Sequence, residues 1–182
     1  LHDALPICCQ IGGFIHHASG QSLWFSEKFS HADFAALPLK LDQQMQRSIS
    51  ALKALAQIAL IHLVSNFSPG SRMPICLKSL SDNSGAESVS NKCFTTTKPL
   101  WFFVEKLTML ASVTGVELDV SHIPGPDNVI ADDLSRWDFV SAIPHDFSSH
   151  DRIRFSLASL WHPNLSCRLY PVTSQLLWSI PK

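Results

Sequence analysis

Apolar and polar positions alternate along several short stretches of the chain, a period that places apolar side chains on one face of a β-strand. Near the start, residues 11–17 and 23–25 follow this pattern on either side of the turn-forming residues 18–21, so they predict a β-hairpin. His16 and His17 are neighbours and therefore point to opposite faces of the strand. We interpret them as partly exposed strand residues rather than as metal ligands.

Two further strands are predicted later in the chain. One begins at Ile75 and ends at residues 81–83. The other covers residues 116–123 and stops at a Pro-Gly turn. Asp82 is therefore expected at the carboxyl end of a strand, which is the usual place for chemistry in an open α/β sheet.

Apolar residues at three- and four-residue steps predict a long amphipathic helix of roughly twenty residues. Its apolar positions are Met45, Ile49, Leu52, Ala56, Ala59 and Leu63. A second helix is predicted from Pro99 to about Thr114, with Gly115 as its C-cap. We interpret the aromatic residues 101–103 of this helix as core rather than as a surface for stacking on bases.

Shorter segments complete the expected α/β domain. Residues 26–41 predict a loop, since Pro38 argues against a long helix. Residues 87–92 predict a short helix. Asp127 or Asn128 is expected to cap another helix, because a side-chain oxygen there accepts a hydrogen bond from an orphan backbone N–H.

The composition is that of a globular protein. The chain has 182 residues, of which 46% are hydrophobic and 16% charged, enough for one domain with a core and a tail. The net charge of −1 counts mildly against strong independent binding to nucleic acid, which usually comes with a basic excess. Five cysteines without C-x-x-C spacing argue against a disulfide framework and a structural zinc site, and favour an intracellular location.

No contact with a membrane is predicted. By inspection, no run approaches the ~20 apolar residues of a membrane span. The start of the sequence also lacks the charged segment and long apolar segment of a signal peptide.

The composition changes after Arg136. Residues 137–182 contain four prolines and several serines, and predict a mostly irregular tail with little core of its own. Residues 153–157 fit either a short strand or one helical turn. The large apolar residues of the tail, namely Trp161, Leu169, Tyr170 and Trp178, suggest that it docks on a partner or on a neighbouring domain.

We expect the first seven residues to have a different origin from the rest. The codons CTA CAC GAC GCT CTT CCG ATC would encode residues 1–7, and this string resembles the end of a common short-read sequencing adapter. We therefore expect residues 1–7 to be a scar, with a different natural sequence in their place, and we exclude them from the fold.

A long phrase near the end of the predicted domain resembles a known family. Residues 121–136 read S-H-I-P-G-P-D-N-V-I-A-D-D-L-S-R. They resemble the end of the ribonuclease H domain in the reverse transcriptases of retroelements, H-I/V-P-G-x-x-N-x-x-A-D-x-L-S-R. In that family the aspartate that matches Asp132 is a metal-binding carboxylate. Taken alone, the spacing fits a capped surface helix with acidic residues in its first turn.

Two further phrases carry the resemblance. Residues 81–86 read S-D-N-S-G-A and resemble S/T-D-N-x-x-A, in which the aspartate matching Asp82 is a second metal-binding carboxylate. Taken alone, S-D-N is also a good turn and N-cap. Residues 49–56 read I-S-A-L-K-A-L-A and resemble I-N-x-L-E-x-x-A on the long helix. The family's catalytic glutamate is replaced here by Lys53.

The resemblance implies a ribonuclease H-like α/β fold over residues 8–136, a mixed five-stranded sheet flanked by helices, truncated at its N-terminus. It also implies Mg²⁺ held by four carboxylates. Asp82 and Asp132 match two of these. The family's first aspartate has no secure counterpart, because Asp3 lies in the adapter-like segment. The accessory histidine is also unmatched, since His122 belongs to a strand end.

The charges at these positions predict a damaged metal site. Asp82, Asp132 and Lys53 together carry −2 + 1 = −1, against −4 for four carboxylates. We expect the Lys53 ammonium to bridge both aspartates in place of a metal. The alternative is a Lys53 side chain that points into solvent.

The function implied by the resemblance is metal-dependent hydrolysis of RNA in RNA–DNA hybrids, within a polyprotein that carries a reverse transcriptase domain upstream. The lysine at position 53 predicts that this copy is inactive. Two alternatives remain open: a non-catalytic connector or nucleic-acid-binding remnant, and a decayed fragment without function.

Overall fold

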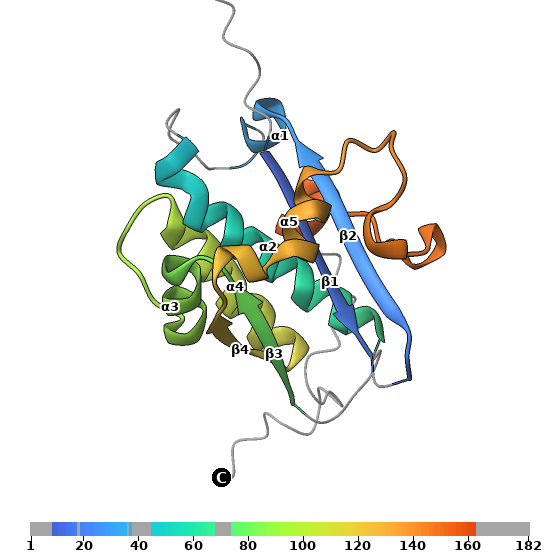
Figure 1. Cartoon of the computed structure of the whole chain (residues 1–182). Coiled ribbons are helices and arrows are strands. Elements are labelled where there is room, and N and C mark those ends of the chain that lie inside the picture. Colours follow the sequence, from blue (N-terminus) through green and yellow to red (C-terminus); the bar gives the residue numbers. More distant parts are fainter. Residues whose placement is uncertain (1–8, 18, 36, 38–44, 68–73, 163–182) are drawn as a thin grey trace, which may run out of the picture.

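The computed structural model describes residues 9–17, 19–35, 37, 45–67 and 74–162 (Figure 1). Its strands are β1 (Cys9–His16), β2 (Ser22–Phe29), β3 (Ile75–Ser81) and β4 (Val116–His122). Its α-helices are α1 (His31–Ala35), α2 (Met45–Phe67), α3 (Ser84–Lys92), α4 (Leu100–Thr114), α5 (Val129–Arg136) and α6 (Leu157–Trp161). Short 3₁₀ turns η1 (Gly125–Asp127), η2 (Pro144–Asp146) and η3 (Ser149–Asp151) lie between them. The expected mixed α/β class is confirmed.

The strands form two separate pairs. β1 and β2 are antiparallel, with Cys9 opposite Phe29, and β3 and β4 are parallel, with Ile75 opposite Val116. The sequence predicted one five-stranded sheet, whereas the described residues contain four strands in two two-stranded sheets. β1 and β3 do not pair with each other, since a pocket lies between them, and a fifth strand is not among the described residues.

Helix α2 lies at the centre of the core, against β1 and α4. The side chains of Leu55, Ile58 and Leu63 on this helix are fully buried. The stretch Ser48–Ser65 is long and apolar enough to cross a membrane, a property that inspection of the sequence missed. Because 61% of this stretch is buried inside the fold, the packing of a core helix accounts for its apolar character.

Helix α4 begins and ends where the sequence predicted. Pro99 precedes it, and Gly115 ends it in the left-handed region at φ 70°. The neighbouring aromatic residues have different environments. Phe103 is fully buried, as expected of core, whereas Trp101 is 41% exposed.

Helix α5 lies directly on β1 because Gly12 has no side chain. A Cβ atom at Gly12 would come within 2.4 Å of the backbone nitrogen of Ser135 and 2.5 Å of the carbonyl carbon of Leu134. Leu134 is fully buried at this contact, and Ser26 of β2 donates a hydrogen bond to its carbonyl oxygen at 2.7 Å. The helix that carries Asp132 is therefore fixed to the hairpin.

The described part of the chain after Arg136 covers the outer face of the β1–β2 hairpin (Figure 1). It is mostly irregular as far as residue 156, as the sequence predicted. It packs on its own domain, whereas the sequence suggested a partner or a neighbouring domain. Helix α6 then enters the core, where Leu157, Leu160 and Trp161 are buried and the Trp161 ring lies 5.3 Å from that of Phe103. Leu169, Tyr170 and Trp178 lie outside the described residues.

Arg152 holds this segment to the hairpin. Its guanidinium lies 5.5, 5.2 and 5.0 Å from the ring centroids of Trp24, Trp137 and Phe139. It also donates a hydrogen bond of 2.5 Å to the carbonyl oxygen of Ser26. Its nearest carboxylate is Glu27, at 3.6 Å. We call Arg152 with Trp24, Ser26, Glu27, Trp137 and Phe139 the Arg152 cluster.

Candidate functional site

The residues that the sequence singled out lie at the carboxyl ends of the parallel strands. Asp82 follows β3 directly. The chain leaves β4 beside it, since the backbone nitrogen of Ile123 donates to the carbonyl oxygen of Ser81 at 2.9 Å. The 3₁₀ turn η1 and helix α5 follow β4. The sequence phrases around Asp82 and Asp132 therefore lie at the same edge of the β3–β4 sheet.

The S-D-N phrase forms the turn and the N-cap that its residues predicted when taken alone. Asn83 is the N-cap of α3, and its side-chain oxygen accepts a hydrogen bond from the backbone nitrogen of Ala86 at 2.8 Å. Ser50 of α2 donates to the same oxygen at 3.0 Å, which ties α2 to this turn. The cap fixes the turn, and Asp82 is left facing α2.

Lys53 and Asp82 form an ion pair. The Nζ atom of Lys53 lies 2.8 Å from Oδ1 of Asp82, and the two side chains are 31% and 22% exposed. Burial raises the pKa of the Asp82 carboxyl group, but the close contact and positive charge of Lys53, with a hydrogen bond from Asn128, outweigh burial. The pKa of Asp82 is therefore below its ordinary value, and the carboxylate is the stable form.

The predicted bridge by Lys53 is present to one aspartate and absent to the other. Asp132 lies in the first turn of α5 and pairs with Arg136 one turn later, with Oδ2 at 3.0 Å from Nε. Its neighbour Asp133 contacts Nε2 of His145 at 2.7 Å. Lys53 therefore compensates Asp82 alone, because Asp132 has a cationic partner on its own helix. The alternative of a Lys53 side chain free in solvent is wrong.

Asn128 was predicted as a helix cap, and its position is confirmed but its contact is different. It is the N-cap residue of α5, yet its side chain makes no capping hydrogen bond there. The side chain is instead hydrogen-bonded to Asp82. Sequence reasoning missed this contact, because cap preferences describe only the local backbone.

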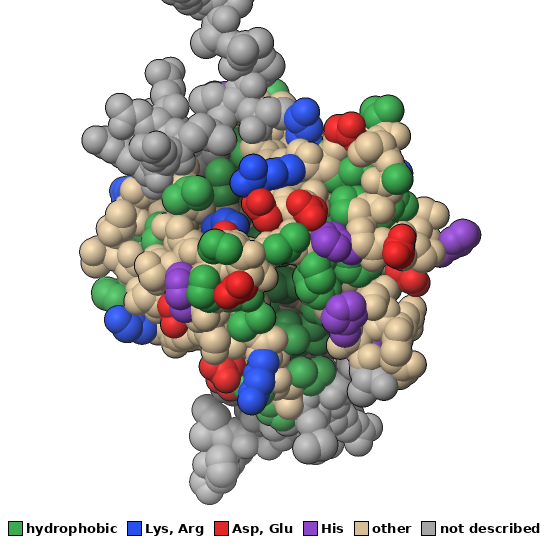
Figure 2. Space-filling model, in the orientation of Figure 1, with side chains coloured by type: hydrophobic (Ala, Val, Ile, Leu, Met, Phe, Trp, Pro, Cys, Tyr) green, Lys and Arg blue, Asp and Glu red, His purple; other side chains and the backbone are tan. Residues whose placement is uncertain are grey.

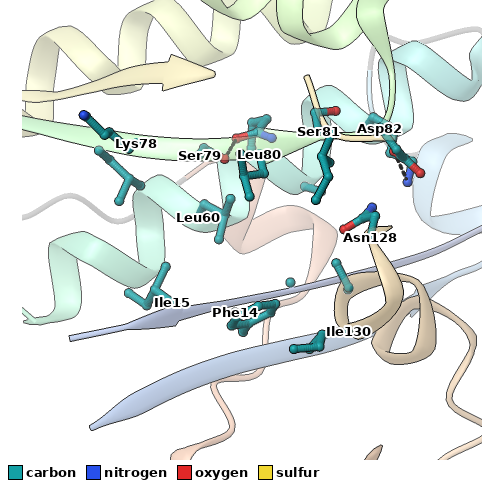
Figure 3. A pocket seen from close by; sticks show the side chains of 18 of the residues that line it. Phe14, Ile15, Leu60, Lys78, Ser79, Leu80, Ser81, Asp82, Asn128 and Ile130 are labelled. Atoms are coloured by element: carbon teal, nitrogen blue, oxygen red, sulfur yellow. Dashed lines mark hydrogen bonds and ion pairs between the residues drawn. The ribbon is translucent and has the colours of Figure 1, made fainter. Parts of the chain in front are cut away.

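A pocket of about 360 Å³ opens beside the ion pair (Figure 3). It lies between β1 and β3, and its walls include Phe14, Leu60 and Leu80. Figure 2 shows a hydrophobic hollow on this face of the molecule, with acidic and basic side chains above it. Gln57 and Ser79 also line it and are joined by a hydrogen bond of 2.8 Å between Oε1 and Oγ.

These residues do not fit a Mg²⁺ site. Hard divalent ions need several oxygen ligands, and one carboxylate here already has an ammonium group at 2.8 Å. Within the described part of the chain, no three His, Cys, Asp or Glu side chains are arranged so that they could hold a metal ion. Asp3, the doubtful counterpart of the first aspartate, lies outside the described residues.

Two of the histidines that the sequence singled out contact serines, and the third is exposed. His16 contacts Ser22 at 2.6 Å and His17 contacts Ser19 at 2.8 Å, both at the turn of the hairpin. His122 is the last residue of β4 and is exposed, in keeping with its assignment to a strand end.

Comparisons with protein-family models, with curated proteins and with solved structures found no match for this chain.

Proposed function

We propose that this chain is a ribonuclease H-like domain of the retroelement reverse transcriptase type in which an ion pair has replaced the nuclease centre. It is then a folded, non-catalytic unit. The three sequence phrases support the family. The order of elements supports it too: a hairpin, a long helix, a strand that ends at Asp82, and a last helix that carries Asp132.

One observation carries the loss of activity, namely the 2.8 Å contact between Lys53 and Asp82. A metal ion at this place would have to displace an ammonium group that already neutralises the carboxylate. Electrostatic repulsion between Lys53 and a divalent cation adds to that cost. The residues that the structure describes around Asp82 therefore supply neither the charge nor the ligands for metal-dependent hydrolysis.

An RNA–DNA hybrid is the proposed ligand, and a reverse transcriptase domain upstream is the proposed neighbour. The net charge of −1 favours weak binding, since phosphate contacts depend on lysine and arginine. The runner-up is a connector without affinity for nucleic acid. Fluorescence anisotropy with a labelled hybrid at two salt concentrations distinguishes them, because only a binder shows a signal that falls with salt.

Replacing Lys53 by glutamate tests the proposal. The chain as it stands is expected to leave labelled RNA in an RNA–DNA hybrid intact in Mg²⁺ or Mn²⁺. It should also bind Mn²⁺ no better than background in electron paramagnetic resonance titrations. Lys53→Glu removes the ammonium group and places a second carboxylate beside Asp82, and we expect Mn²⁺ to bind at least about tenfold more tightly.

Lys92→Glu is the matched control, since it makes the same change of charge at the exposed end of α3. Its Mn²⁺ binding should equal that of the parent chain. Hydrolysis of the hybrid by the parent chain would contradict the proposed loss of activity. Equal Mn²⁺ binding by the Lys53→Glu and Lys92→Glu variants would show that position 53 does not face a metal site.

A further inference from the structure

One half-buried histidine, His62 of α2, lies against α6 and the segment that leads into it. Its ring centroid lies 6.0 Å from that of Phe155, two positions before α6 begins. The backbone of Leu160, within α6, also acts on its charge. Because α6 has only five residues, its own hydrogen bonds are too few to keep it helical in water. Its position therefore depends on contacts such as those with His62.

The imidazole ring of His62 is held in its neutral form. Burial lowers the pKa of His62 below the ordinary value of 6.5, and it outweighs the polar backbone of Leu160, which raises the pKa. The Nε2 atom is buried, and no described residue is in hydrogen-bond geometry with it. A protonated imidazole donates from both nitrogens, so a proton on Nε2 would be left without an acceptor.

The charges around the ring also oppose protonation. The ammonium group of Lys106 on α4 lowers the pKa of His62, and it lies 6.0 Å from the ring centroid of Trp161 on α6. Helix α6 has no charged side chain, and the nearest one on α2 is Lys53, nine positions earlier.

The other titratable side chains on the described elements around α6 do not contribute to the pKa of His62. They lie on β2, α1, α4 and the segments that flank α6, namely Glu27, Lys28, His31, Asp33, Glu105, Arg152, Arg154 and His162. Protonation would therefore place a second cation near Lys106, with no carboxylate of the described residues to compensate it.

Helix α6 is the element that can yield to this charge. Its buried residues are Leu157, Leu160 and Trp161, and the Trp161 ring packs on that of Phe103. It is the last helix of the described residues and belongs to neither of their sheets. It can therefore leave α2 and α4 without breaking a strand pair.

We propose that His62 is a pH-dependent switch for the docking of α6. The neutral ring allows α6 to pack on α2 and α4, and protonation of the ring at mildly acidic pH releases the helix locally. The release exposes the aromatic ring of Phe103, so the acid form presents an apolar surface that the neutral form covers. This proposal goes beyond the proposed function and is independent of it, because no residue around Asp82 takes part.

The direction of the pH dependence separates His62 from its acidic neighbour. The folded pKa of His62 is lowered, so its contribution is fully present above pH 6.5 and is lost as pH falls from there through the folded value. Glu27 accepts a hydrogen bond from the backbone nitrogen of Phe155 at 3.1 Å, and burial raises its pKa. Acid therefore increases the contribution of Glu27, so Glu27 cannot cause a release at low pH.

Hydrogen exchange of the full chain tests the switch. The backbone amides of Leu160 and His162 donate to the carbonyl oxygens of Ser156 and Ala158 at 3.1 and 2.7 Å, so they report whether α6 is formed. Between about pH 7.5 and about pH 5.5, their protection factors, corrected for the intrinsic effect of pH, should fall at least about threefold. Those of α4 should stay constant. His62→Gln retains a polar side chain that cannot be protonated, and it should abolish the fall.

Two further variants make the result specific. His122→Gln is the matched control, since it removes an exposed histidine, and its α6 amides should behave as in the parent chain. Lys106→Met removes the facing charge but retains an unbranched side chain over Trp161, so the fall should be smaller. An equal fall in the parent and His62→Gln chains would overturn the proposal. So would an undiminished fall in Lys106→Met, or an equal loss of protection in α4 and α6.

Discussion

Two cations, Arg152 and Lys53, join segments far apart in the sequence, and their surroundings differ. Arg152 is enclosed by three aromatic rings, a carbonyl oxygen and a carboxylate, and its side chain is 11% exposed. Lys53 has one carboxylate partner beside an open pocket and is 31% exposed. The first cation is part of the architecture, whereas the second lies where a ligand could reach it.

The pKa shifts of the carboxylates show the same difference. Burial raises the pKa of Glu27 beside Arg152, and the hydrogen bond from Phe155 and the charge of Arg152 at 3.6 Å do not offset it. Burial also lowers the pKa of Arg152. At Asp82, the lysine outweighs burial and the pKa falls. Arg152 therefore stabilises the fold mainly through the three aromatic rings around it and the hydrogen bond to the Ser26 carbonyl oxygen. Lys53 does so mainly through its charge.

The largest effect is expected at Arg152. Arg152→Ala removes the contacts with three rings and the cation that is paired with Glu27 at 3.6 Å, so we expect a loss of about 3 kcal/mol in the free energy of unfolding. Urea denaturation followed by tryptophan fluorescence measures it. Arg154→Ala is the control, since Arg154 is exposed, and should cost less than about 0.5 kcal/mol. Equal losses in the two variants would mean that the Arg152 cluster does not hold the tail.

A smaller effect is expected from the pH dependence of Glu27. Its pKa is raised in the folded chain, so this carboxyl group stabilises the fold in its neutral form, and the contribution is lost as pH rises from about 4.5 through the folded value. Glu27→Gln removes this dependence. The stability of the variant relative to the parent should therefore rise with pH across that window, as measured by Tm at several pH values. A constant difference would contradict the burial of this carboxylate.

The smallest effect on stability is expected at Lys53. Lys53→Gln should cost about 0.5 kcal/mol or less, because both partners are partly exposed. The pKa of Asp82 is lowered in the folded chain, so the pair stabilises the fold above the ordinary value of 3.8, and this is lost as pH falls through the lower folded value. In the Lys53→Gln variant, the hydrogen bond from Asn128 is the main remaining contact that opposes the effect of burial, so the pKa of Asp82 should rise. Carbon NMR of the Asp82 carboxyl group measures the change, and an unchanged value would contradict the ion pair.

Most secondary structure could be predicted from the sequence, because periodicity and caps are local. The long helix, the helix that ends at Gly115 and the strand that ends before Asp82 all follow from spacing and from turn residues. The cover of the hairpin could not be predicted. It depends on contacts such as that between Arg152 and the Ser26 carbonyl, 126 positions apart, in a segment without periodicity.

The candidate site was predictable only in part. The phrases around Asp82 and Asp132 predicted which residues approach the strand ends, and Lys53 was expected to pair with an aspartate. The choice between the two aspartates depends on Arg136, which lies one turn after Asp132 on the same helix. The gap between β1 and β3 was invisible in the sequence, because no pattern within either strand indicates what lies at its edge.

The residues of the Arg152 cluster are synthesised at very different times on the ribosome. Trp24 is fully buried, but its cover, including Trp137 and Phe147, is synthesised more than one hundred residues later. At about 5–20 residues per second, that interval lasts on the order of ten seconds. During this time the indole of Trp24 is exposed to solvent on the hairpin. A shortened chain that ended at Arg136 would leave the Trp24 indole exposed permanently, and would be a substrate for chaperones.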